Sequence, residues 1–171
     1  VGFDFTKEKI ITKGNIKETS DYLELKLATI FRKNIEKKIP TNSTLDKKKS
    51  NIFGQLHYKP INNILLNYDF AINNDLNEFQ YNSINTKINY EKFSTQFNFL
   101  EEVGIISKSN VIENISSYSF NDENTLSFGT RKNRNLNLTE YYKLLYQYKN
   151  DCLIAGVEYK KNYYNDADIK P

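Results

Sequence analysis

Few residues of this sequence have side chains that could carry out chemistry, and they do not form a catalytic set. The chain of 171 residues has one cysteine, Cys152, and one histidine, His57, so it offers neither an internal disulfide nor the spacing of metal ligands. Glu101 and Glu102 are adjacent, and adjacent side chains on a strand point to opposite faces, so they cannot act as an acid–base pair. We therefore expect a protein that is not an enzyme and uses no cofactor.

A basic cluster of Arg131, Lys132 and Arg134 is a weak candidate for binding. Paired cations of this kind bind phosphate groups, but most such runs are solvated strand ends, and both interpretations stay open. The net charge of the chain is only +3, with both signs interspersed, which does not favour nucleic acid as a partner.

The elements that must position these residues are strands, because apolar and polar residues alternate with period two along the chain. The clearest case is 64–72, where Ile64, Leu66, Tyr68, Phe70 and Ile72 share one face. The sequence predicts an all-β fold, an antiparallel up-and-down meander of about ten strands. We place these strands at 3–12, 20–32, 51–59, 64–73, 77–90, 93–101, 111–120, 125–132, 139–149 and 152–164.

The connections between these strands alternate in length. Tight turns at 60–63, 91–92, 121–124 and 150–151 alternate with longer connections at 33–50, 74–76, 102–110 and 133–138. Short turns on one edge and longer loops on the other are typical of outer-membrane β-barrels, and the 13 tyrosines, several near strand ends, suit a lipid headgroup region. The pattern thus favours part of a large transmembrane β-barrel. A soluble β-sandwich alternates in the same way and stays an alternative.

The last third of the chain resembles the end of the barrel region in the family of the lipopolysaccharide-assembly protein LptD. A strand that ends in tyrosine, over 138–149, leads through a polar turn to Cys152 and then to a strand of the form Gly-x-Glu-Tyr with basic residues. The residues that stand at the family's positions are Gly156, Glu158, Tyr159, Lys160, Asp168 and Pro171. The segment 40–54 also resembles a family loop that enters a strand.

The resemblance implies that residues 1–171 are one segment of a C-terminal barrel domain, without the N-terminal periplasmic domain, the first strands and the final strand. It implies a bacterial outer-membrane protein that inserts lipopolysaccharide into the outer leaflet by conformational work. The implied partners are an LptE-like plug lipoprotein, a periplasmic lipopolysaccharide-transport bridge, lipopolysaccharide and outer-membrane lipids. The alternative is a porin or another outer-membrane transport barrel.

The resemblance also assigns roles to the candidate residues. Cysteines at the place of Cys152 bridge to the N-terminal periplasmic domain in this family, so Cys152 is a candidate for a disulfide whose partner lies outside this chain. Many family members have two adjacent cysteines here, whereas this chain has Asp151 before Cys152, so one bridge is the most it could form. The phosphates that Arg131, Lys132 and Arg134 would contact are those of lipopolysaccharide.

Overall fold

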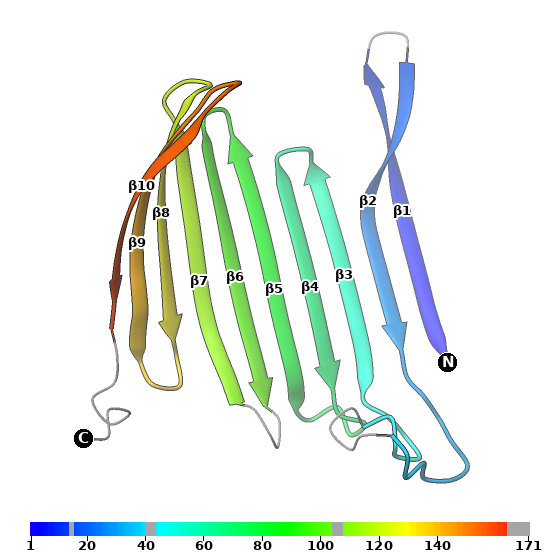
Figure 1. Ribbon diagram of the computed structural model, residues 1–171. Coiled ribbons are helices and arrows are strands. Elements are labelled where there is room, and N and C mark those ends of the chain that lie inside the picture. The colour runs from blue at the N-terminus through cyan, green and yellow to red at the C-terminus, as the bar shows by residue number, and fades with distance from the viewer. Residues whose placement is uncertain (14–15, 40–43, 104–107, 164–171) are drawn as a thin grey trace, which may run out of the picture. The chain divides into compact units, whose positions relative to one another are not determined.

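The computed structural model describes residues 1–13, 16–39, 44–103 and 108–163 (Figure 1). Ten strands, each hydrogen-bonded to the next in the chain, form one sheet in the order β1 to β10. The predicted all-β fold and the meander order are therefore confirmed. No helix among the described residues is long and apolar enough to cross a membrane.

The strands are 9 to 13 residues long. Their bounds are β1 Gly2–Lys13, β2 Ile16–Ala28, β3 Ile52–Ile61, β4 Ile64–Ile72, β5 Phe79–Tyr90, β6 Phe93–Val103, β7 Lys108–Ser119, β8 Asn124–Asn133, β9 Leu138–Lys149 and β10 Ile154–Asn162.

The predicted strands match these bounds within a few residues, with three differences. β2 ends at Ala28 because the chain beyond it pairs with residues of its own connection, as in the hydrogen bond from Ser50 N to Ile30 O. β6 and β7 extend to Val103 and from Lys108, so the predicted connection 102–110 is shorter, and its residues 104–107 lie outside the described ones. Cys152 belongs to the turn before β10 instead of to the strand.

The described residues divide into two compact units, which we treat separately. Unit 1 comprises 1–84 with 101–108, and unit 2 comprises 85–100 with 109–171. In unit 1, β1 to β4 pair antiparallel, and a bulge lies in the β1–β2 pairing between Lys7 and Glu8. In unit 2, β7 to β10 pair antiparallel, with a register shift between Arg131 and Lys132 where β8 meets β9.

The registers assign side chains to two faces in each unit, because side chains directly opposite one another in a pairing share a face. In unit 1, Leu25, Leu56 and Tyr68 form one row, and the next row is Glu24, His57 and Asn67. In unit 2, Phe128, Leu144 and Tyr159 form one row, and Ser127, Leu145 and Glu158 form the next. Each unit therefore has an apolar face and a polar face.

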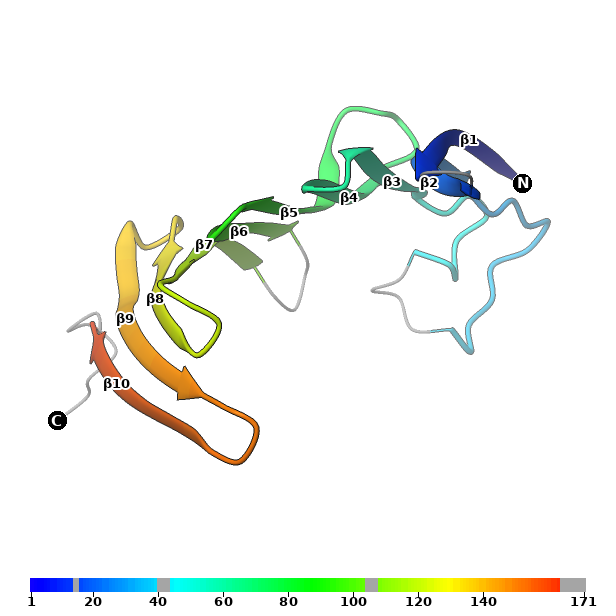
Figure 2. The ribbon, with the colours of Figure 1, turned by 90° about the horizontal axis from the view of Figure 1, so that it is seen from above.

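Neither unit has a core of the usual kind. Among the described residues, the only buried hydrophobic side chains are Ala71 and Val111. In each unit the strands form a single layer, and no second layer of described strands lies against it (Figure 2). The stability of such a layer depends on strand pairing and on whatever medium covers the apolar face.

Candidate functional site

The apolar face of unit 2 is broad and open. Phe128 and Leu144 are 42% and 43% exposed, although they lie on inner strands with a neighbour on both sides. On β10, Val157 and Tyr159 are more exposed still. A contiguous apolar surface of this kind marks contact with a membrane or with another protein, because water is a poor solvent for it.

Three polar side chains on this apolar face form hydrogen bonds with one another. Ser116 Oγ donates to Asn114 Oδ1 at 3.0 Å, and Asn114 Nδ2 donates to Thr95 Oγ1 at 3.0 Å. Thr95 Oγ1 and Ser116 Oγ are 2.9 Å apart. Since the single hydroxyl proton of Ser116 goes to Asn114, Thr95 must be the donor to Ser116.

The result is a closed ring, which we call the polar ring of Thr95, Asn114 and Ser116. The second amide proton of Asn114 is also used, in a 3.1 Å bond to the carbonyl oxygen of Gln96. Every polar hydrogen of the ring thus has an acceptor within the protein. A group satisfied in this way can lie in an apolar medium without the cost of an unpaired donor.

Some tyrosine hydroxyls and cations on the apolar faces also have partners within the protein. The hydroxyls of Tyr22 and Tyr58 are 3.4 Å apart in unit 1, and Tyr146 OH donates to Asn124 Oδ1 in unit 2. Cations lie over aromatic rings, with Lys161 Nζ 5.0 Å from the ring centre of Tyr163. Such cation–π contacts offset part of the hydration that a cation loses in an apolar medium.

Unit 1 has a close aromatic contact on its apolar face. Gly54 is opposite Phe70 in the β3–β4 pairing, and the Phe70 ring covers the position where a Cβ atom of residue 54 would stand. Phe70 also stacks on Tyr68, with ring centres 5.2 Å apart, and contacts Phe79 edge to face. Residue 54 must therefore be a glycine for the Phe70 ring to occupy this position.

The polar face of unit 2 is centred on Glu113. Tyr141 OH donates to Glu113 Oε1 at 2.6 Å, and Asn98 Nδ2 donates to Glu113 Oε2 at 3.0 Å. Asn85 in turn donates to Asn98. This network joins β5, β6, β7 and β9, so several strands share one chain of polar contacts.

Ion pairs extend the network toward β10. Lys143 Nζ is 2.8 Å from Glu158 Oε2, and Lys160 Nζ lies 4.7 Å from the ring centre of Tyr141. Arg131 Nε is 2.8 Å from Glu140 Oε2, although its N–H does not point along that line, so the contact is an ion pair instead of a hydrogen bond.

The structure does not bring Arg131, Lys132 and Arg134 together. Arg131 lies in the row of Glu113 and Tyr141 on the polar face, whereas Lys132 is opposite Ile112 and points to the other face. Arg134 lies over the ring of Phe99, 5.7 Å from its centre. The three charges therefore do not form one phosphate site, and contact with lipopolysaccharide through them stays a prediction.

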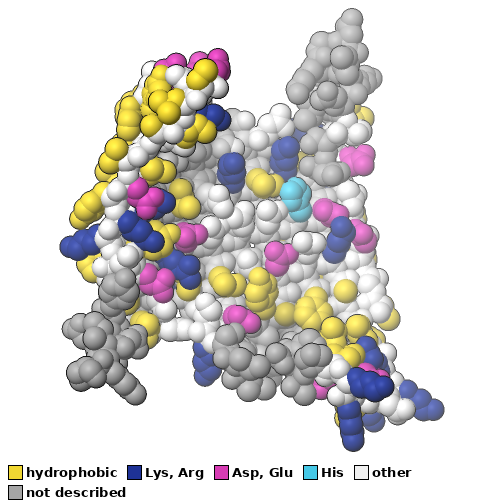
Figure 3. Space-filling view, in the orientation of Figure 1, with side chains coloured by type: hydrophobic (Ala, Val, Ile, Leu, Met, Phe, Trp, Pro, Cys, Tyr) yellow, Lys and Arg dark blue, Asp and Glu magenta, His cyan; other side chains and the backbone are white. Residues whose placement is uncertain are grey.

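The polar face of unit 1 carries His57, whose Nδ1 is 2.7 Å from Asn67 Oδ1. Figure 3 looks onto this face, where the cyan histidine is surrounded mostly by polar and charged side chains. Asn82 Nδ2 donates to Glu101 at 3.3 Å in the same unit. No group of three or more His, Cys, Asp or Glu residues in the described part of the chain could hold a metal ion.

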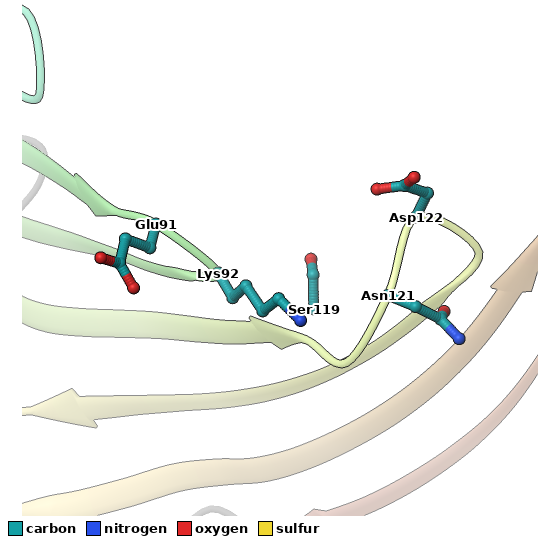
Figure 4. Close-up of a pocket in the computed structure, with 5 residues that line it drawn as sticks. All are labelled: Glu91, Lys92, Ser119, Asn121 and Asp122. Carbon is teal, nitrogen blue, oxygen red and sulfur yellow. The ribbon is translucent and has the colours of Figure 1, made fainter.

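The turn edge of unit 2 contains Cys152 and a shallow groove. Cys152 is exposed, and its backbone N–H donates to Asn150 Oδ1 at 3.0 Å within the turn. The groove lies between the β5–β6 and β7–β8 turns, and Lys92 Nζ donates there to Phe120 O at 2.9 Å. The other lining side chains, Glu91, Ser119, Asn121 and Asp122, do not converge on a common point (Figure 4). The disulfide of Cys152 stays a prediction, since its partner would lie outside this chain.

No protein-family model matches the chain. No curated protein matches its sequence either. Of the positions that carry the resemblance to the LptD family, Gly156, Glu158, Tyr159 and Lys160 lie on β10, and Asp168 and Pro171 lie outside the described residues.

Proposed function

We propose that this chain forms part of the wall of an outer-membrane β-barrel, with its apolar face toward lipid and its polar face toward an aqueous interior. The observation that carries the proposal is the polar ring on the apolar face. Surfaces that meet water have no need to satisfy every polar hydrogen internally, whereas surfaces that meet hydrocarbon do. The exposure of Phe128 and Leu144 and the charges of the opposite face support the same orientation.

Lipid and water accessibility of the two faces tests this proposal. Nitroxide labels are attached at Leu144 and Phe128 on one face and at Lys143 and Ser127 on the other, with the only natural thiol removed by Cys152→Ser. In bilayers we expect the first pair to be relaxed by oxygen and the second by a water-soluble nickel complex. If all four labels respond to the nickel complex, the sheet is not a membrane wall.

Within this class, we propose lipopolysaccharide transport and assembly as the function, through an LptD-like translocon in the bacterial outer membrane. The resemblance over 124–171 supports this choice above a porin. The work would be conformational and not enzymatic, with an LptE-like lipoprotein, a periplasmic transport bridge and lipopolysaccharide as partners. Cys152 is exposed in the turn before β10, which supports a bridge to a periplasmic domain as part of this proposal.

Depletion of the protein in its own cell separates the two barrel functions. We expect newly made lipopolysaccharide to disappear from the cell surface while small-solute permeability through porins persists. Normal surface lipopolysaccharide with a lowered uptake of small solutes would favour a porin-like barrel instead. A thiol assay on the mature protein addresses the disulfide separately, because a reduced Cys152 would reject it.

A further inference from the structure

The connection between β2 and β3, residues 29–51, has a larger net positive charge than the whole chain. Seven basic and two acidic residues give it a net charge of +5, whereas the whole chain has +3, so the remainder of the chain is negative. The basic residues are Arg32, Lys33, Lys37, Lys38, Lys47, Lys48 and Lys49. Lysine and arginine side chains gather over this connection at the lower right of Figure 3.

Backbone hydrogen bonds fold this basic loop back on itself. Ser50 N donates to Ile30 O at 3.0 Å, Arg32 N to Lys48 O at 2.8 Å and Glu36 N to Asp46 O at 2.9 Å. Ser50 is fully buried at the base, where its Oγ accepts a bond from Ile30 N at 2.9 Å. The two basic arms, 32–38 and 46–49, therefore lie side by side, and the loop stands off the strands of unit 1 (Figure 2).

The surface that this loop presents is positive, because its acidic groups are withdrawn. Asp46 is buried, and the half-buried carboxylate of Glu36 accepts a bond from the backbone N–H of Lys38 at 3.2 Å. All six lysines are exposed, and none of them forms an ion pair with another described residue. Like charges held side by side repel one another, so an anionic partner would lower the energy of this arrangement.

Apolar side chains lie among these cations. Phe31 and Ile35 are 59% and 60% exposed on the first arm, beside Arg32 and Lys33. Alternating cationic and apolar groups match the surface of an anionic membrane, which offers phosphate charges above an acyl boundary. Nucleic acid fits less well, because the loop has a single aromatic ring on which a base could stack.

From these contacts we propose that the two described arms of this loop, 29–39 and 44–51, dock on phosphorylated lipid headgroups, with the lysines at the phosphates and Phe31 and Ile35 at the acyl boundary. The inference rests on the loop alone. It holds whether or not the strands themselves cross a membrane, so it can fail or succeed independently of the proposed barrel function.

The test uses the full chain in a non-ionic amphipol and its co-sedimentation with vesicles of phosphatidylcholine, with or without phosphatidic acid. We expect binding only when phosphatidic acid is present. The triple variant Lys47→Gln, Lys48→Gln, Lys49→Gln should weaken it about a hundredfold, because each basic residue near an anionic surface contributes roughly a fivefold gain in affinity. The matched control is Lys9→Gln, Lys87→Gln, Lys149→Gln, which removes the same charge from exposed strand positions.

Retained binding by the control, with far-ultraviolet circular dichroism unchanged in both variants, would support the docking surface. Three outcomes would overturn it. One is an equal loss in the control, which would indicate a net-charge effect. Another is displacement by inorganic phosphate at constant ionic strength, which would indicate a site for the free ion. The third is tighter binding of polyuridylate than of the vesicles, which would indicate a nucleic-acid surface.

Discussion

The two faces of the sheet hold their polar groups in different ways. On the apolar face of unit 2, the polar ring of Thr95, Asn114 and Ser116 closes on itself. On the polar face, the pairs are open to their surroundings, and the Lys143 and Glu158 side chains remain 37% and 43% exposed while 2.8 Å apart. This difference is the basis of our proposal that the apolar face meets hydrocarbon and the polar face meets water.

The largest expected effect comes from a charge placed on each face in turn. Leu144→Arg puts a guanidinium among Phe128 and Tyr159, and we expect it to destabilise the protein in a bilayer by about 2–4 kcal/mol, the cost of a cation near the midplane. Leu145→Arg, on the polar face, is the matched control and should cost much less. Equal free energies of unfolding for the two variants in guanidinium titrations would remove the distinction between the faces.

A methyl group added at a glycine should also have a different effect on stability on the apolar face than on the polar face. In Gly54→Ala the new methyl group overlaps the Phe70 ring, and we expect a loss of roughly 1–3 kcal/mol from overpacking. Gly129→Ala on the polar face of unit 2 meets its nearest atom at 3.7 Å, an ordinary contact, so it should be close to neutral. Urea titrations in detergent measure both. If Phe70→Leu does not reduce the penalty of Gly54→Ala, the ring is not its cause.

Replacing one residue of the polar ring should lower the stability of the protein more than replacing all three. Thr95→Val leaves one amide proton of Asn114 without an acceptor and removes the bond that Ser116 Oγ accepts, and an unpaired polar group costs about 1–3 kcal/mol away from water. Replacing all three residues, as Thr95→Val, Asn114→Leu and Ser116→Ala, removes the unpaired groups, so this variant should be more stable than the single one. A triple variant that is less stable than Thr95→Val would show that water reaches the ring.

The smallest effect is expected for an ion pair of the polar face. Lys143→Gln removes the contact with Glu158, and a pair with this much exposure contributes at most roughly 1 kcal/mol. Its effect should shrink as salt is added, because exposed charges are screened. A double-mutant cycle with Glu158→Gln measures the pair directly. An interaction energy that is large and independent of salt would place this pair out of contact with water.

Much of the fold could be predicted, because a strand with one apolar face has apolar and polar residues that alternate along the sequence. Alternation over 64–72 placed β4 within one residue at its end, and it also assigned Asn67 and Phe70 to opposite faces. The bounds of β2 and β7 were less accurate. Ile30 and Phe31 continue an apolar pattern but pair inside the basic loop, and a local pattern cannot reveal that competition.

The candidate site was harder to predict, because it depends on which strands are neighbours. Thr95 reads as one more member of an apolar face, and only the pairing of β6 with β7 brings it to Asn114 and Ser116. The available signal was the presence of hydroxyl and amide residues at apolar-face positions of two successive strands. Arg131 and Lys132 are adjacent in sequence but point to opposite faces of β8, so the contact of this cluster with lipopolysaccharide stays a prediction.

The sequence by itself determined the strands, their order and the two-faced character of each, because these depend on local alternation and short turns. The tertiary structure decided how polar groups are satisfied. Register places Glu113 beside Tyr141 and closes the polar ring, and the folding back of residues 29–51 places two basic arms side by side. These contacts join residues far apart in the chain, so they follow from strand register and from long-range backbone pairing, which no local pattern encodes.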